Sequence, residues 1–119
     1  MSRSKVVLVL GDDDKSPLLE KLLSFGFTAI VHDDMFEGLK KLRHERFDAV
    51  FVDRGHLEAD VIEFALNVRD FDERIPIIAA GKPSDAYENQ ILLKQRNVFV
   101  FDNAPEMIYE RIENILNSG

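Results

Sequence analysis

The sequence contains no cysteine, so disulfides and thiolate metal sites are excluded, and this composition suits a reducing compartment. It also lacks a long hydrophobic run, because the longest, Val6 to Leu10, is far too short to cross a bilayer. The N-terminus shows no secretory hydrophobic region followed by a cleavage site. We therefore expect a cytoplasmic protein that does not enter the membrane.

Basic residues are scarce: 15 lysines and arginines face 22 aspartates and glutamates, which gives a net charge of −7. Nucleic-acid binding normally depends on clustered Lys and Arg that displace counterions, so no direct nucleic-acid partner is expected. The chain has 119 residues, 45% hydrophobic and 31% charged, as in ordinary folded domains. Without linkers, repeats or low-complexity tracts, residues 1–119 form one predicted domain.

Short apolar runs rich in β-branched and aromatic residues predict five buried strands. They are Val6 to Leu10, Thr28 to Val31, Ala49 to Val52, Ile75 to Ala80, and Val98 to Phe101. The intervening segments carry apolar residues at helical spacing. These are Leu18, Leu19, Leu22 and Leu23; Phe36, Leu39 and Leu42; Val61, Phe64, Ala65 and Val68; a weaker helix over Asp85 to Lys94; and Ile108, Ile112, Ile115 and Leu116.

Two residues support the predicted helix boundaries. Gly26 is well placed to end the first helix, and Pro105 suits the first turn of the last helix. Alternating strands and helices imply right-handed crossovers, and hence parallel strands with helices on both faces. The predicted fold is an open doubly wound α/β sheet.

Acidic residues follow several of the predicted strands, at the edge where such sheets bind ligands. They are Asp12, Asp13 and Asp14; Asp33 and Asp34; Asp53; and Asp102. Carboxylates crowded together favour a divalent cation, and oxygen ligands suit Mg²⁺. Helix capping is the alternative, favoured for Asp33 and Asp34, whereas Asp53 follows the central strand directly.

Over its whole length the chain resembles the receiver domains of two-component response regulators. The resemblance rests on the acidic cluster after the first strand and on the order of three segments. These are Phe-Asp-Ala-Val-Phe-Val-Asp ending at Asp53, Ile-Pro-Ile-Ile from Ile75, and Arg-Ile-Glu-Asn-Ile-Leu from Arg111. It implies a flavodoxin-like parallel sheet with strand order 2-1-3-4-5.

The same resemblance implies specific site residues. Asp53 matches the aspartate that accepts a phosphoryl group from a histidine kinase. Asp12 and Asp13, with Asp53 and the backbone carbonyl of Gly55, match the Mg²⁺ ligands, although Asp14 leaves the register open by one position. A metal would screen the repulsion between the carboxylate and the incoming phosphoryl group.

Two family positions are altered. Gly81 stands where receivers carry a Ser or Thr hydroxyl after the fourth strand, and Phe101 stands where they carry Lys at the end of the fifth. Lys82, next to Pro83, is a candidate substitute cation, and a solvated loop lysine is the plainer interpretation. Arg54 could also neutralise carboxylates, but strand alternation turns it away from Asp53.

The altered positions favour a pseudo-receiver, which is an interaction module with a degenerate acceptor site and no enzymatic activity. Its partner would be a histidine kinase or an output domain at the face of helix 4, strand 5 and helix 5, and the chain would be a monomer or a weak homodimer. A receiver that is phosphorylated on Asp53 is the alternative.

Three further site types are disfavoured. Asp12 to Ser16 resemble the loop of haloacid dehalogenase-like phosphatases, but the chain is short for that core and lacks a cap. A flavin or nucleotide site would need a glycine-rich phosphate loop and would place phosphates against carboxylates. His32, His44 and His56 lack metal-ligand spacing, so no zinc site is predicted.

Overall fold

The computed structural model describes residues 5–11, 17–54, 60–83, 85–101 and 105–117. Five parallel strands form one sheet in the order β2-β1-β3-β4-β5. The strands are β1 (Val6–Leu10), β2 (Thr28–His32), β3 (Ala49–Asp53), β4 (Ile77–Ala80) and β5 (Val98–Phe101). The predicted doubly wound fold and its strand order are therefore confirmed.

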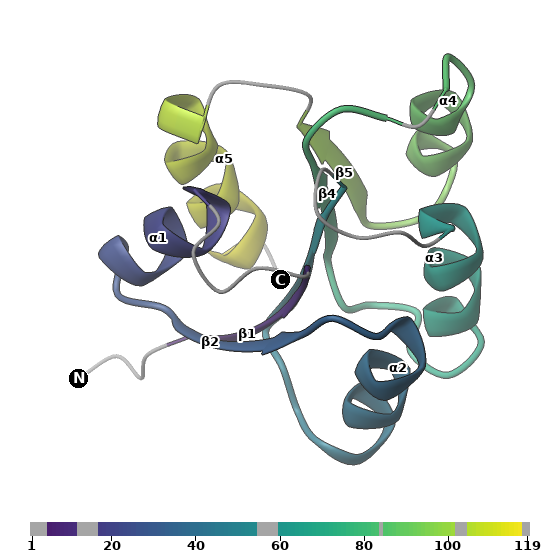
Figure 1. Cartoon of the computed structure of the whole chain (residues 1–119), viewed down its shortest axis with the longest axis horizontal. Coiled ribbons are helices and arrows are strands. Elements are labelled where there is room, and N and C mark those ends of the chain that lie inside the picture. Colours follow the sequence, from purple (N-terminus) through teal and green to yellow (C-terminus); the bar gives the residue numbers. More distant parts are fainter. Residues whose placement is uncertain (1–4, 12–16, 55–59, 84, 102–104, 118–119) are drawn as a thin grey trace.

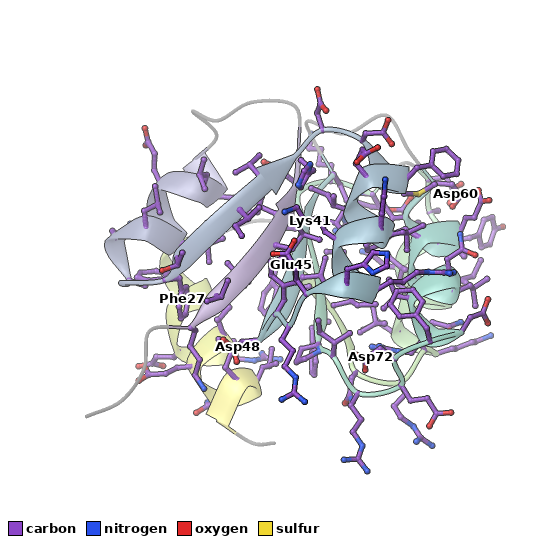
Figure 2. The ribbon with its side chains drawn as sticks, turned by 90° about the horizontal axis from the view of Figure 1, so that it is seen from below. Phe27, Lys41, Glu45, Asp48, Asp60 and Asp72 are labelled. Atoms are coloured by element: carbon purple, nitrogen blue, oxygen red, sulfur yellow. The ribbon has the colours of Figure 1, made fainter. Side chains whose placement is uncertain are left out.

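Helices cover both faces of the sheet: α1 and α5 lie on one side, and α2, α3 and α4 on the other (Figure 1). Figure 2 shows the same two layers from below. The helices are α1 (Pro17–Ser24), α2 (Met35–His44), α3 (Val61–Arg69), α4 (Glu88–Leu93) and α5 (Pro105–Asn117). Within the described ranges, no helix is long and apolar enough to cross a membrane.

The sheet divides the core into two halves because successive strand residues point to opposite faces. In β1, Leu8 and Leu10 pack with α2, α3 and α4, whereas Val7 and Val9 pack with α1 and α5. All of these side chains are buried. Burial on both faces explains why the strands read as continuous apolar runs.

Aspartates cap two of the helices, α2 and α3. Asp34 Oδ1 accepts hydrogen bonds from the backbone N–H groups of Phe36 (2.7 Å) and Glu37 (3.3 Å), and Asp60 Oδ1 accepts from that of Glu63 (3.1 Å). The capping role predicted for Asp34 is confirmed, since its oxygen satisfies otherwise open helix donors. Gly26, at φ +89°, follows the end of α1 as predicted.

The predicted apolar faces of α1 and α2 and the predicted start of the fourth strand were partly wrong. Phe36 is 73% exposed and Leu23 52% exposed, so neither joins the apolar face of its helix. Met35 packs against the core in place of Phe36. Strand β4 begins at Ile77, after Pro76, which has no N–H to donate to a ladder.

The fourth helix is shorter than the Asp85 to Lys94 span that the sequence suggested. It covers Glu88–Leu93. Asp85 lies before it, where Oδ1 accepts from the N–H groups of Tyr87 (2.8 Å) and Glu88 (3.0 Å). Asp85 therefore organises the turn that begins the helix.

Candidate functional site

Asp53 closes the central strand of the sheet. Its strand pairs with β1 on one side and with β4 on the other, and Asp53 itself is level with Ala80. The residue is only 7% exposed, in a strand whose other members are all apolar. The fold therefore places one buried carboxyl group at the carboxyl edge of the sheet, where doubly wound folds bind ligands.

Gly11 lies directly beside Asp53. A Cβ added at Gly11 would stand 3.3 Å from the Asp53 Cβ and 3.9 Å from its Oδ2. The N–H of Gly11 donates to the carbonyl of His32 (3.0 Å), which continues the pairing of β1 with β2. The residue directly after β1 thus has no side chain, and the Asp53 side chain packs against it.

The other predicted metal ligands, Asp12, Asp13 and the carbonyl of Gly55, lie outside the described residues, as does Asp14. Across the described ranges, no three His, Asp or Glu side chains are grouped as metal ligands. Within the part of the chain that the structure describes, Asp53 supplies one carboxylate of the type that Mg²⁺ binds at this edge.

Gly81 follows β4 in a backbone conformation that L side chains rarely adopt. Its φ is +95°, and its N–H donates to the carbonyl of Phe101 (2.9 Å). Glycine populates this region without steric penalty, whereas a β-branched residue there is strained. The backbone at Gly81 therefore disfavours Thr, one of the two residue types that the receiver resemblance leads us to expect at this position. Lys82, the candidate substitute cation, has an exposed side chain.

Phe101 ends β5 and is paired with Ala80, the last residue of β4. Gly81 follows Ala80 directly. Its ring packs against the core half that contains Ala80, and the guanidinium carbon of Arg111 lies 5.7 Å from the ring centroid. An aromatic ring with a cation over its face stands where the family resemblance led us to look for a lysine.

Arg54 turns away from Asp53, as strand alternation predicted. Its Nη1 donates to Glu88 Oε1 (3.2 Å) and to Asn89 Oδ1 (2.5 Å), and its Nη2 donates to the carbonyl of Gly81. The side chains of Arg54 and Glu88 are 2% and 7% exposed. This charged pair therefore joins the end of β3 to α4 inside the protein.

Sequence reasoning missed Glu88 and Asn89. They lie 34 and 35 positions from Arg54, in the short helix for which the apolar pattern was weakest. An arginine directly after a buried strand was the one available signal, because a guanidinium there needs carboxylate or carbonyl partners.

Arg69 is a half-buried cation whose partners the sequence did not reveal. Its guanidinium donates to four backbone carbonyls, those of Asp72 (3.0 Å), Ile75 (2.8 Å), Arg96 (2.9 Å) and Asn97 (3.2 Å). Burial lowers the pKa of the Arg69 guanidinium, against a smaller raising effect from Asp72. Arg69 ties the end of α3 to the loops that precede β4 and β5.

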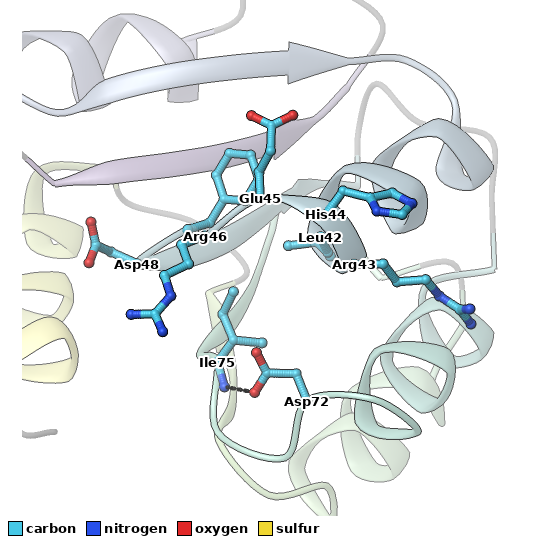
Figure 3. A pocket seen from close by; sticks show the side chains of 9 residues that line it. Leu42, Arg43, His44, Glu45, Arg46, Asp48, Asp72 and Ile75 are labelled. Carbon is cyan, nitrogen blue, oxygen red and sulfur yellow. Dashed lines mark hydrogen bonds between the residues drawn. The ribbon is translucent and has the colours of Figure 1, made fainter.

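A cavity of about 540 Å³ opens at the amino edge of the sheet, opposite Asp53 (Figure 3). Its lining mixes cations such as Arg43 and Arg46 with carboxylates such as Asp48 and Asp72. Asp48 Oδ2 accepts from the N–H of Val6 (2.7 Å), and Asp72 Oδ1 accepts from that of Ile75 (3.1 Å). These two carboxylates therefore hold the chain segments at the rim of the cavity in place.

Histidines contribute little to the site edge. His32 is half-buried at the end of β2 and His44 is exposed at the end of α2, while His56 lies outside the described residues. The two described histidines thus belong to different elements, as the sequence analysis expected.

Solved structures of receiver domains share this fold. A CheY-like response regulator receiver domain from Methanospirillum hungatei superposes with a TM-score of 0.81 at 17% identity, covering 98% of this chain and 96% of that one. The receiver domain of a sensor histidine kinase from Pseudomonas aeruginosa, solved with magnesium in its active-site cleft, gives 0.78 at 16% identity, with 96% and 98% covered.

A putative response regulator from Chloroflexus aurantiacus gives a TM-score of 0.77 at 20% identity, covering 96% of this chain and 98% of that one. No protein-family model and no curated protein matches the sequence. The likeness therefore rests on three-dimensional structure: the chain has the CheY-like, flavodoxin-type fold of response regulator receiver domains.

Proposed function

We propose that this domain acts in response-regulator signalling as an interaction module, a pseudo-receiver whose acceptor site is not coupled to a conformational switch. The proposal rests on the backbone conformation of Gly81. At φ +95° its backbone disfavours a Ser or Thr, and its carbonyl accepts from the Arg54 guanidinium. A Ser or Thr whose hydroxyl would contact a phosphoryl group on Asp53 is therefore disfavoured at this position.

The partner surface of this proposal is the face formed by α4, β5 and α5. Tyr87 and Leu93, at the start and end of α4, are 68% and 61% exposed, which makes them candidate apolar anchors. A histidine kinase or an output domain is the proposed partner. The NtrC4 receiver domain, which has a TM-score of 0.78 and 16% identity to this chain, is a dimer when beryllofluoride-activated. We propose a monomer or weak homodimer here.

A phosphorylatable receiver is the second candidate, because Asp53 is buried at the carboxyl end of β3 beside the space left by Gly11. In that case Asp53, Asp12, Asp13 and the carbonyl of Gly55 would hold Mg²⁺, which would neutralise charge between the carboxylate and the phosphoryl group. The Pseudomonas aeruginosa receiver domain contains magnesium in the corresponding kind of cleft.

Intact-mass spectrometry after incubation with Mg²⁺ and acetyl phosphate separates the two candidates. The pseudo-receiver predicts no stable phosphoryl adduct on the wild-type chain. An adduct that forms on the wild type and is lost in Asp53→Asn would instead establish the phosphorylatable receiver. Adducts present equally in Asp53→Asn would be unspecific and would leave Asp53 unmodified, as the pseudo-receiver requires.

A Mg²⁺ titration followed by thermal unfolding tests the metal separately. A ligand that binds only the folded state raises the melting temperature. The pseudo-receiver predicts a melting temperature that does not change at millimolar Mg²⁺. A rise that is abolished by both Asp53→Asn and Asp12→Asn would identify a metal site with these ligands.

A further inference from the structure

The position of α4 is fixed by a buried polar cluster, here called the Arg54 lock and defined as Arg54, Gly81, Glu88 and Asn89. One guanidinium binds the Glu88 carboxylate at 3.2 Å, the Asn89 side-chain oxygen at 2.5 Å and the Gly81 carbonyl. The backbone N–H of Arg54 donates to Ala80 (2.8 Å) as well. The lock therefore joins the ends of β3 and β4 to the first turn of α4.

Burial makes the lock difficult to open. The side chains of Arg54 and Glu88 are almost fully removed from solvent. In such surroundings separating the two ions leaves an unpaired charge in a low-dielectric interior, which is far costlier than parting an exposed pair. The Lys41–Glu45 pair on α2 provides the comparison, because its atoms are 2.7 Å apart yet its side chains are 36% and 46% exposed (Figure 2).

The lock and the acceptor carboxylate lie on opposite faces of the sheet. Asp53 lies against Gly11, whereas Arg54 reaches α4, which packs on the other face through Leu92. A conformational change needs a free-energy difference between two states, and the lock stabilises only the state in which the first turn of α4 stays hydrogen-bonded to Arg54.

We propose that Arg54 is a conformational lock that holds α4 and the β4–α4 junction in one position, whatever the state of Asp53. This goes beyond the proposed function, since the lock would act in a phosphorylatable receiver as well as in a pseudo-receiver. Its failure would therefore not decide whether Asp53 accepts a phosphoryl group.

Amide hydrogen exchange, resolved by residue, tests the lock in the whole chain. The variants are Arg54→Met, which keeps the length of the side chain without its charge, and Glu88→Gln, which keeps its shape. Lys41→Met is the matched control, because it removes an exposed ion pair at the end of a different helix, α2. The readout is the exchange rate in α4, including the amide of Ile91, which donates to the carbonyl of Tyr87.

In Arg54→Met, exchange in α4 should accelerate about tenfold or more, because the free energy needed to open this helix locally is lower without the lock. Exchange in β1 and α2 should change little. Glu88→Gln should give a smaller acceleration in the same residues, and Lys41→Met none there. Unchanged exchange in α4, or an equal acceleration throughout the chain, would overturn the proposal. If Arg54→Met does not fold, Glu88→Gln decides by the same criteria.

Discussion

Asp53 and Arg54 are neighbours in the chain, and alternation along β3 gives them opposite surroundings. Asp53 packs against Gly11, while Arg54 binds Glu88 and Asn89. The position of Asp53 could be predicted from the sequence because an apolar strand ends on it. The partners of Arg54 could not, since they depend on the rotation of a short helix that lies 34 positions away.

Replacing Gly81 tests the claim that the switch position disfavours a side chain. Gly81→Thr should lower the free energy of unfolding by about 2 kcal/mol, because a β-branched residue at φ +95° is strained. Urea denaturation measures the loss. Gly26→Ala is the control: Gly26 has φ +89° with no heavy atom within 4 Å of an added Cβ, so about 1 kcal/mol is expected. Wild-type stability in Gly81→Thr would contradict the assigned conformation.

Arg69 offers a second test at this scale. Arg69→Met removes the donor from four carbonyls around the ends of α3, β4 and β5, so the free energy of unfolding should fall by about 2 kcal/mol. Arg43→Met removes a guanidinium carbon that lies 4.9 Å above the Phe71 ring and should cost at most about 1 kcal/mol. Chemical denaturation measures both losses. If Arg69→Met and Arg43→Met lower the free energy of unfolding equally, the carbonyl contacts of Arg69 do not contribute to stability.

At the scale of elements, the strands follow from composition and the helix boundaries from local chemistry. Strands buried on both faces appear as continuous apolar runs, which explains why β1 has the predicted bounds. Helix faces were less predictable. Met35 and Phe36 are adjacent and both apolar, and only the capping geometry at Asp34, which sets where α2 begins, decides that Met35 packs inward.

The cap of α2 gives a prediction for this element. Asp34→Ala should lower the free energy of unfolding by about 1 kcal/mol, because it removes the acceptor for the N–H groups of Phe36 and Glu37. Asp33→Ala serves as the control, since Asp33 is exposed just before the cap and should change stability by less than about 0.5 kcal/mol. Thermal or urea unfolding of both variants makes the comparison, and the prediction fails if Asp33→Ala costs as much as Asp34→Ala.

At the scale of the whole molecule, the parallel sheet brings the proposed acceptor position, Asp53, and the two positions that differ from the receiver resemblance, Gly81 and Phe101, to one edge, while α4 packs on a single face (Figure 1). Asp53, Gly81 and Phe101 end three adjacent strands or directly follow them. Gly81 belongs both to this edge and to the Arg54 lock. It is the position where the receiver resemblance implies a hydroxyl, and its carbonyl accepts a hydrogen bond from Arg54. Our account is that the surface of α4 is preset by the fold and is not moved by charge at Asp53.

The most direct measurement of that claim is a two-dimensional amide NMR titration with Mg²⁺ and beryllofluoride, a phosphoryl mimic that binds aspartate. The account predicts that the signals of Glu88–Leu93 stay where they are in the free domain, whether or not those of Gly11 and Asp53 respond. Saturable movement of the α4 signals that disappears in Asp53→Asn would contradict it, because it would show that the acceptor site drives α4 after all.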